Sequence, residues 1–131
     1  MKLKPVLLKI INIAEDYYNV SKSKYTLALE SGYFDVYDQI SERDLSIVLE
    51  EQPTKINYWI RLSEDQRSSE GKYLKINDGK FFVVEFNNTN GYHEEEQEYP
   101  NLQTACAAFV KYEIEFSRAL WVEKFSKKKK K

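Results

Sequence analysis

The sequence predicts an α+β domain with N-terminal helices, a four-stranded antiparallel meander and a long C-terminal helix packed on the sheet. Three observations lead to this prediction. Apolar residues recur at helical spacing before Pro53, the apolar period becomes two over residues 56–86, and a helical apolar stripe returns after Pro100. Helices followed by a run of strands and a closing helix are typical of a two-layer α+β domain.

The first expected helix begins near the N-terminus, with Pro5 in its first turn, where the missing N–H costs nothing. A second helix is expected over residues 22–31, because Ser21 can cap its start and Gly32 can adopt the left-handed conformation at its end. Residues 25–29 also alternate slightly, as a strand would, but the cap and stop signals favour a helix. The apolar stripe of the first helix consists of Leu3, Leu7, Ile10, Ala14 and Tyr17.

The third expected helix and the first expected strand meet at Pro53. Ser41 and Asp44 have the spacing of a capping box, so the helix begins there and ends before the proline. After Pro53, apolar and polar residues alternate over residues 56–61, which predicts a strand with two usable faces.

Three further strands are separated by polar segments. Residues 63–71 form a loop, and residues 72–76 and 80–86 form a hairpin around an Asp-Gly dipeptide, a strong signal for a tight turn. Residues 92–99 are nearly all polar, so this strand has little to bury and is expected at an edge of the sheet.

The final helix opens at Pro100 and carries the longest apolar stripe in the chain. We expect it to lie across the sheet, with Phe109 and Phe116 in the core between them. The stripe consists of Leu102, Ala105, Cys106, Phe109, Tyr112, Phe116 and Leu120.

The chain is long enough for one domain, which we assign to residues 1–126, and the lysine run at 127–131 is expected to be disordered. The formal net charge is −1, but five of the 20 basic residues belong to that run. The remaining 15 basic residues face 21 acidic ones, so the body of the domain is acidic. An acidic field repels nucleic acid and attracts basic partners.

Residue types that carry catalysis are scarce. His93 lies beside glutamates in the most polar strand, and Cys106 lies on the apolar face of a helix, where it behaves as a small core residue. No glycine-rich phosphate loop is present. Glu94 and Glu96 could share a metal ion, whereas Glu95 would point to the other side of the strand, and calcium-loop spacing is missing. We therefore expect neither an enzyme nor a cofactor.

No apolar run approaches the roughly 18 residues needed to span a bilayer. The N-terminal apolar stretch is interrupted by Lys9 and followed by Glu15 and Asp16, unlike a secretory signal peptide. We expect a cytoplasmic protein that does not contact a membrane.

What remains is a surface for a protein partner. Aromatic anchors surrounded by acids suit a basic partner, and two aromatic residues are expected on the sheet face opposite the last helix. The polar loop before the hairpin and the acidic edge strand complete this surface. Its candidate partner-binding residues are Trp59, Glu64, Asp65, Arg67, Tyr73, Glu94, Glu95, Glu96 and Glu98.

Residues 59–73 contain Trp59, the run Ser-Glu-Asp-Gln-Arg at 63–67 and the run Gly-Lys-Tyr at 71–73. This segment resembles a stretch of small bacterial immunity proteins, which neutralise toxins of contact-dependent inhibition and related polymorphic toxin systems. Residues 105–110, Ala-Cys-Ala-Ala-Phe-Val, are similar to the helix that follows the strand pair in those proteins. The resemblance covers about residues 41–125 and implies a small non-catalytic α+β protein made beside a cognate toxin. It carries over no toxin-contacting residue.

The leading hypothesis is therefore an immunity protein that binds a toxic nuclease domain, in a 1:1 complex, and blocks its active site. A nuclease must present a basic cleft to phosphate, which an acidic inhibitor can occlude. The alternative is a small nucleic-acid-associated or regulatory domain that uses the lysine tail. An enzyme with paired carboxylates is the least favoured hypothesis.

Overall fold

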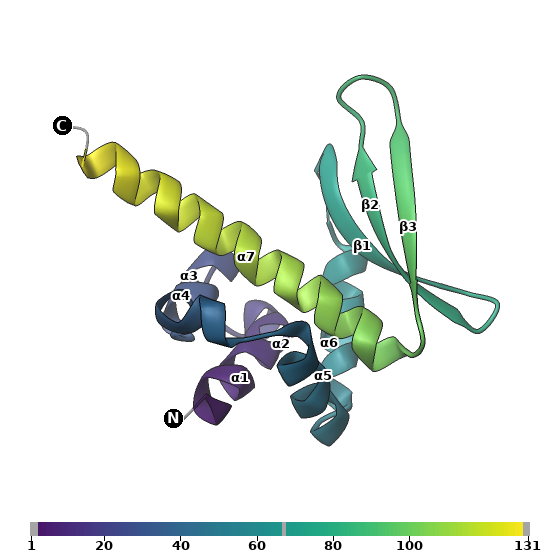
Figure 1. Ribbon diagram of the computed structural model, residues 1–131, viewed down its shortest axis with the longest axis horizontal. Helices are drawn as coiled ribbons and strands as arrows, with labels where there is room; N and C mark the ends of the chain where they lie inside the picture. The colour runs from purple at the N-terminus through teal and green to yellow at the C-terminus, as the bar shows by residue number, and fades with distance from the viewer. Residues whose placement is uncertain (1–2, 67, 130–131) are drawn as a thin grey trace.

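A computed structural model describes residues 3–66 and 68–129 of the chain, and the side chains up to residue 125. This part of the chain forms an α+β fold with helices, a short 3₁₀ helix, an antiparallel sheet and a long C-terminal helix (Figure 1). In chain order the elements are α1 (Lys4–Ile11), α2 (Ile13–Asn19), α3 (Lys24–Glu30), α4 (Tyr33–Val36), η1 (Tyr37–Gln39), α5 (Glu42–Glu51), α6 (Thr54–Glu64), β1 (Glu70–Asn77), β2 (Lys80–Asn87), β3 (His93–Tyr99) and α7 (Leu102–Lys129).

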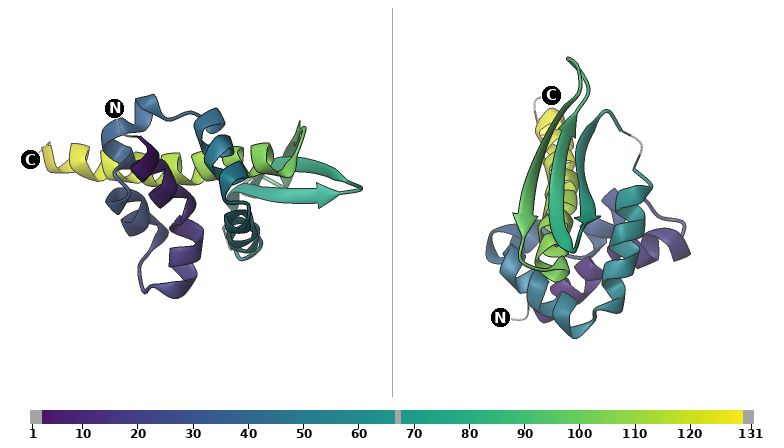
Figure 2. Two further views of the ribbon diagram at one scale, coloured as in Figure 1. Left: turned by 90° about the horizontal axis from the view of Figure 1, so that it is seen from below. Right: turned by 90° about the vertical axis from the view of Figure 1, so that its right-hand side faces the viewer.

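Helix α7 connects the two layers of the molecule. Its first half lies between the sheet and helix α5, and its second half passes over α3 towards a free end far from the sheet (Figures 1 and 2). Residues 105–110 are all buried, and the ring of Phe109 meets that of Trp59 edge-on, with 6.2 Å between centroids. The main core therefore lies where the first half of α7 crosses α5 and α6, and the expected core position of Phe109 is confirmed.

The sheet has the order β1-β2-β3, and both pairs of strands are antiparallel. The turn between β1 and β2 places Asp78 and Gly79 at φ of 52° and 72°, the positive values that an Asp-Gly hairpin turn requires. This turn fixes the register, since Asn77 pairs with Lys80 and every later pair follows. Strand β3 lies at an edge, as its polar sequence predicts.

The prediction of a fourth strand is wrong, because residues 56–61 lie in helix α6. The side chains of Ile56, Trp59, Leu62 and Ser63 are buried on one side of that helix, at spacings of three and four. Pro53 caps its start, where a proline costs no hydrogen bond. The short alternation in this segment was compatible with both periods, and burial against the first helices selects the helical one.

The N-terminal helical stretch is divided at Asn12 into α1 and α2, which the continuous apolar spacing did not reveal. Helix α3 begins two residues later than expected. Its cap is Ser23, whose hydroxyl accepts a hydrogen bond from the N–H of Thr26 at 3.1 Å, and not Ser21. Gly32 has φ of 88°, so its expected left-handed conformation is confirmed.

The capping box of α5 is present as the sequence predicts. The hydroxyl of Ser41 accepts from the N–H of Asp44 at 3.2 Å, and the N–H of Ser41 donates to the Asp44 carboxylate at 2.9 Å. The helix ends at Glu51, just before Pro53. Helix α5 therefore has a fixed start and end, and it packs along the first half of α7.

Two expectations about α7 need correction. Phe116 was expected in the core, but 55% of its surface is exposed because the second half of the helix has left the sheet. The lysine run at 127–131 was expected to be disordered, whereas the backbone of residues 127–129 continues α7. Residues 130 and 131 lie outside the described part of the chain.

Candidate functional site

The strand register divides the sheet into two faces. Val83 belongs to the main core cluster, and its cross-strand partners Leu74 and Gln97 share its side, which we call the inner face. Val84 and its partners Tyr73 and Glu96 point the other way, and we call this side the outer face. The outer face consists of Gly71, Tyr73, Lys75, Asn77, Lys80, Phe82, Val84, Phe86, Glu94, Glu96 and Glu98.

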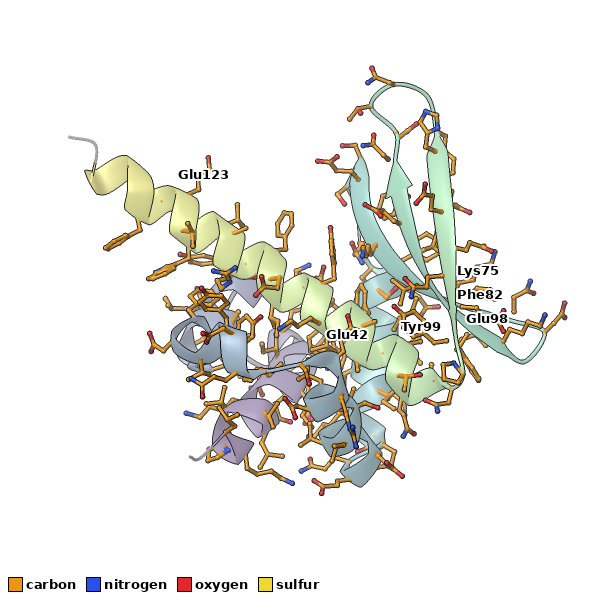
Figure 3. The ribbon with its side chains drawn as sticks, in the orientation of Figure 1. Glu42, Lys75, Phe82, Glu98, Tyr99 and Glu123 are labelled. Carbon is orange, nitrogen blue, oxygen red and sulfur yellow. The ribbon has the colours of Figure 1, made fainter. Side chains whose placement is uncertain are left out.

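The outer face points away from the helices. Figure 3 shows Lys75, Phe82 and Glu98 on the side of the sheet opposite α7. Val84 at its centre is nevertheless 0% exposed. Its neighbours are Tyr73 across the strand pair and the two phenylalanines of the same strand, and the rings of Tyr73 and Phe86 lie 5.8 Å apart. Half-buried aromatic rings therefore form a small apolar cluster on this face.

Polar contacts join the aromatic cluster to the carboxylates of β3. The hydroxyl of Tyr73 donates to Glu94 at 3.2 Å, and the hydroxyl of Tyr92 donates to the same carboxylate. Burial and this hydrogen bond raise the pKa of Tyr73, and the hydrogen bond to Glu94 raises the pKa of Tyr92 to about 12. Both hydroxyls therefore stay protonated and act as donors at neutral pH.

A second contact ties β1 to β3. The ammonium of Lys75 pairs with Glu96 and lies 5.8 Å from the ring centroid of Phe82. The hydrogen bond to Glu96 raises the pKa of Lys75, so the ammonium stays protonated at neutral pH. The outer face then carries three carboxylates, from Glu94, Glu96 and Glu98, and two ammoniums, from Lys75 and Lys80, among its described residues. It is an acidic surface with an aromatic centre.

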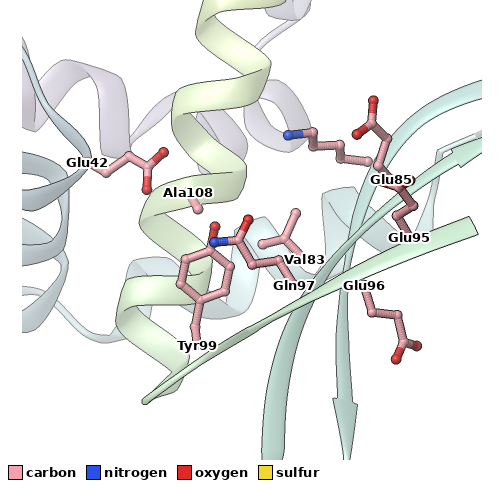
Figure 4. A pocket seen from close by; sticks show the side chains of 9 residues that line it. Glu42, Val83, Glu85, Glu95, Glu96, Gln97, Tyr99 and Ala108 are labelled. Atoms are coloured by element: carbon pink, nitrogen blue, oxygen red, sulfur yellow. The ribbon is translucent and has the colours of Figure 1, made fainter.

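Glu95 lies on the inner face, as the alternation along a strand requires. It faces a pocket of about 470 Å³ between the sheet and the first half of α7, which we call the acidic crease (Figure 4). Its lining includes the carboxylates of Glu42, Glu85, Glu95 and Glu96, the ammonium of Lys72, and Ala108 of α7. Of the four predicted glutamates of β3, Glu94 and Glu98 therefore belong to the outer face and Glu95 to the acidic crease, whereas Glu96 belongs to the outer face and also borders the crease.

The remaining predicted site residues do not join the outer face. Trp59 is 0% exposed on α6, where its indole N–H donates to the carbonyl of Ile11 at 3.0 Å. Its prediction as a partner-binding residue is wrong, because the segment is helical and its tryptophan packs inward. Glu64 is exposed in the last turn of α6, and Asp65 follows it as the cap of that helix. Arg67 lies outside the described residues.

Asp65 is engaged within the molecule. Its carboxylate accepts a hydrogen bond from the hydroxyl of Tyr18 on α2 and lies 4.0 Å from Nε of Arg61. Burial and the hydrogen bond to Asp65 raise the pKa of Tyr18 to about 12. This contact fastens the end of α6 to α2, which is a structural role.

Groups that could carry metal or thiol chemistry are not assembled in the described part of the chain. No three His, Cys, Asp or Glu side chains within residues 3–66 and 68–129 are placed to hold a metal ion. Cys106 is fully buried on α7, and burial raises the pKa of its thiol. The thiol is therefore protonated and inaccessible at neutral pH.

A second concave surface was not predicted from the sequence. It is an apolar groove of about 580 Å³ beside the second half of α7, lined by rings and side chains from α2, α3 and α7 and by the segment that leads into β1. We call it the apolar groove; its aromatic and aliphatic members are Tyr17, Tyr25, Tyr112, Phe116 and Leu120. The apolar stripe of α7 includes Tyr112, Phe116 and Leu120, but the sequence analysis assigned the entire stripe to the core.

Within the described residues, no helix is both long and apolar enough to cross a membrane. Comparison of the chain with protein-family models, with curated proteins and with solved structures gave no match.

Proposed function

We propose that this chain is a non-enzymatic inhibitor of the immunity-protein type, which binds a basic toxin domain through the outer face of its sheet. The observation that carries the proposal is the outer face itself, where an aromatic cluster around Val84 lies within a row of carboxylates on β3. Interfaces commonly combine a dry aromatic centre with a polar rim. The acids would select a basic partner, and the rings would supply the contact area.

Charge supports a nuclease as the kind of toxin. An enzyme that cleaves RNA or DNA must attract phosphate, so its cleft is basic. An acidic inhibitor reaches such a cleft quickly, because complementary potentials steer the encounter. Once bound, the inhibitor occludes the active site without any chemistry of its own. Such a complex would be 1:1 and would form in the cytoplasm, where the toxin finds its nucleic acid.

The resemblance to immunity proteins of contact-dependent inhibition supports the same proposal from the sequence. Its first segment, residues 59–73, spans the end of α6 and the start of β1. Trp59 in that segment is a core residue, so the shared pattern reflects packing. The partner surface of the proposal lies elsewhere, on β1, β2 and β3.

The test uses the protein encoded beside this one as the toxin candidate. Stopped-flow association with that protein is measured at ionic strengths of about 0.01 M and 1 M, where the Debye lengths are about 30 Å and 3 Å. Changing Glu94, Glu96 and Glu98 together to Gln should slow association by about tenfold at low salt and far less at high salt. A matched control removes three exposed acids from the helices: Asp35→Asn, Asp38→Asn and Glu50→Gln.

The control triple changes the net charge equally, so only the position of the charge differs. Equal slowing by both triples would contradict binding through the outer face. Absence of any complex, or a nuclease that stays active at saturating inhibitor, would refute the inhibitor proposal. RNA binding that disappears when residues 127–131 are deleted would support the nucleic-acid alternative instead.

A further inference from the structure

The register of the sheet determines which backbone groups of its two outer strands have no partner strand. Asn77 and Lys80 flank the tight turn, so they form a hydrogen-bonded pair, and such pairs alternate along an antiparallel ladder. The even-numbered residues of β2 therefore bond to β1, and its odd-numbered residues bond to β3. On β3 this leaves the N–H and C=O groups of Glu94, Glu96 and Glu98 pointing away from the sheet.

The outer edge of β1 is closed by side chains from α6 and the segment that follows it. The hydroxyl of Ser63 accepts a hydrogen bond from the N–H of Leu74 at 2.7 Å. The side-chain amide of Gln66 donates to the carbonyl of Lys72 at 2.6 Å, and the hydroxyl of Ser68 donates to the first carbonyl of β1 at 2.8 Å. These bonds occupy backbone groups that an added strand would need.

The outer edge of β3 is not closed in this way. Within residues 3–66 and 68–129, no hydrogen bond reaches the backbone N–H or C=O groups of Glu94, Glu96 and Glu98 from beyond this edge. Figure 2 shows β1 beside α6 and β3 on the other side of the sheet. The open edge of β3 therefore offers unpaired backbone donors and acceptors along the length of a strand.

The acids of β3 determine what kind of strand can pair with it. Side chains directly opposite one another in paired strands have Cβ atoms about 5 Å apart, so an added strand meets Glu94, Glu96 and Glu98 at close range. If β3 of a second copy paired antiparallel about Glu96, glutamate would lie opposite glutamate at every outer-face position. Like charges directly opposite destabilise a strand pair, whereas lysine or arginine at these positions would form cross-strand ion pairs. The charge therefore disfavours a second copy and favours a basic strand.

The acidic crease provides space on the inner side of such a strand. Glu95, Glu96 and Gln97 all line it, although successive side chains of a strand point to opposite faces, so the crease reaches the edge of β3. Its other walls include Glu42 of α5 and Ala108 of α7 (Figure 4). The inner side chains of an added strand would therefore enter a hollow that is itself acidic.

We propose that the open edge of β3 binds an antiparallel strand of a protein partner, with lysine or arginine at alternate positions opposite Glu94, Glu96 and Glu98. Backbone hydrogen bonds supply affinity, and the alternating charges set the register and select the partner. The inference rests on the proposed function for the identity of the partner. It names the part of that partner that meets this chain, which is an exposed strand with basic side chains on one face.

Amide hydrogen exchange, measured by NMR on the full chain, tests the open edge without any toxin. The probe is a peptide of seven residues, the length of β3, with lysine at positions two, four and six and threonine elsewhere. Without peptide, the N–H groups of Glu94, Glu96 and Glu98 should exchange faster than those of Glu95 and Gln97, which bond to β2. Saturating peptide should slow exchange at the three edge amides by about tenfold or more and change the other two little.

Two N-methylated peptides separate strand pairing from charge attraction. In the proposed arrangement the N–H of the central lysine points to β3, whereas that of the next threonine points away. N-methylation of the central lysine should therefore raise the dissociation constant of the peptide about tenfold or more, and N-methylation of the threonine should change it little. The two peptides have the same charge and composition, so equal dissociation constants would contradict an added strand.

Glu96→Pro tests the same hydrogen bond from the side of the protein. Proline removes the N–H at the open edge and spares the bonds to β2, which come from Glu95 and Gln97. Glu96→Gln is the matched control, because it removes the same carboxylate and keeps the N–H. The proline variant should bind the unmethylated peptide about tenfold more weakly than the glutamine variant. Circular dichroism and urea unfolding check its fold, and the exchange measurement on the wild-type chain needs no variant.

Unchanged exchange at the three edge amides in saturating peptide would overturn the proposal. Protection of these amides that rises with protein concentration alone would also overturn it, because a second copy would then occupy the edge. If the glutamine triple slows association with the toxin candidate but the peptide leaves the edge unprotected, the proposed function stands and the added strand is wrong. Edge protection by the peptide, together with a nuclease that stays active, would give the reverse result.

Discussion

The two halves of α7 carry similar apolar side chains but have different surroundings. In the first half, residues 105–110 are all buried, and Ile114 one turn later is 1% exposed. In the second half, Phe116, Leu120 and Phe125 are between 38% and 55% exposed. An apolar stripe therefore identifies the side of a helix that avoids water. It does not identify what covers that side.

The difference follows from the lengths of the elements. Strands of seven or eight residues extend roughly 25 Å, whereas a helix of 28 residues extends roughly 42 Å. Helix α7 therefore continues beyond the sheet that covers its first half. Beyond that point α3 and α4 cover only one side of it, where Trp121 packs against Phe34.

The largest expected effect comes from truncating the same side chain in each half. Phe109→Ala should lower the free energy of unfolding by about 3–5 kcal/mol, because it leaves a cavity beside Trp59. Phe116→Ala should lower it by less than about 1 kcal/mol, because that ring is already more than half exposed. Urea unfolding of the two variants and of the wild-type chain makes the measurement. Similar losses of stability in both variants would contradict the difference in burial between the two halves of α7.

A smaller effect is expected at α3, the helix that supports the second half of α7. Ser23→Ala should lower the free energy of unfolding by about 1 kcal/mol, because the N–H of Thr26 loses its hydrogen-bond acceptor. Ser21→Ala provides the matched control, since this exposed serine precedes the cap and should change stability little. The measurement is thermal or urea unfolding. If Ser21→Ala lowered stability more than Ser23→Ala, Ser21 and not Ser23 would be the cap of α3.

The smallest effect concerns Glu115, where the two halves of α7 meet. Burial opposes ionisation of this carboxyl, but hydrogen bonds from Arg118 and Tyr33 outweigh it and lower its pKa. A carboxyl with a lowered pKa in the fold stabilises the protein above its unfolded pKa of about 4.3, and this stabilisation disappears as the pH falls through the folded pKa.

Glu115→Gln should therefore cost less than about 1 kcal/mol near neutral pH, because the pair with Arg118 is partly exposed. The difference from wild type should vanish in strong acid, where both chains carry a neutral group. Urea midpoints measured across the acidic range provide the test. A difference that did not change with pH would show that the side chain acts through packing and not through its charge.

The parts of the fold that follow from local chemistry were predictable from the sequence. The capping box of Ser41 and Asp44 fixes the start of α5 through hydrogen bonds within four residues. The Asp78-Gly79 turn likewise fixes the hairpin, because positive φ values at these two positions favour those residue types. In both places the sequence signal and the structure involve the same few residues.

Helix α6 was not predictable in this way. Residues 56–61 alternate like a strand, yet Trp59 packs between Phe109 of α7 and the carbonyl of Ile11. Those contacts come from segments almost 50 residues away, which a window of six residues does not contain. The same distinction applies to the predicted site residues. Tyr73 and three glutamates of β3 share a face because the register of the strands brings them there. Trp59 does not join them, because its segment is a helix and not a strand.

The contacts of the outer face also have an entropic consequence. Glu94 holds two tyrosine hydroxyls, and Lys75 is held by Glu96 above the ring of Phe82, so several side chains on this face are restrained before a partner arrives. Fixing a flexible side chain at an interface costs about 0.5–1.5 kcal/mol of lost rotamer freedom. On the outer face, part of that loss has already occurred during folding. A partner of matching shape therefore meets a surface whose conformational cost of binding is already reduced.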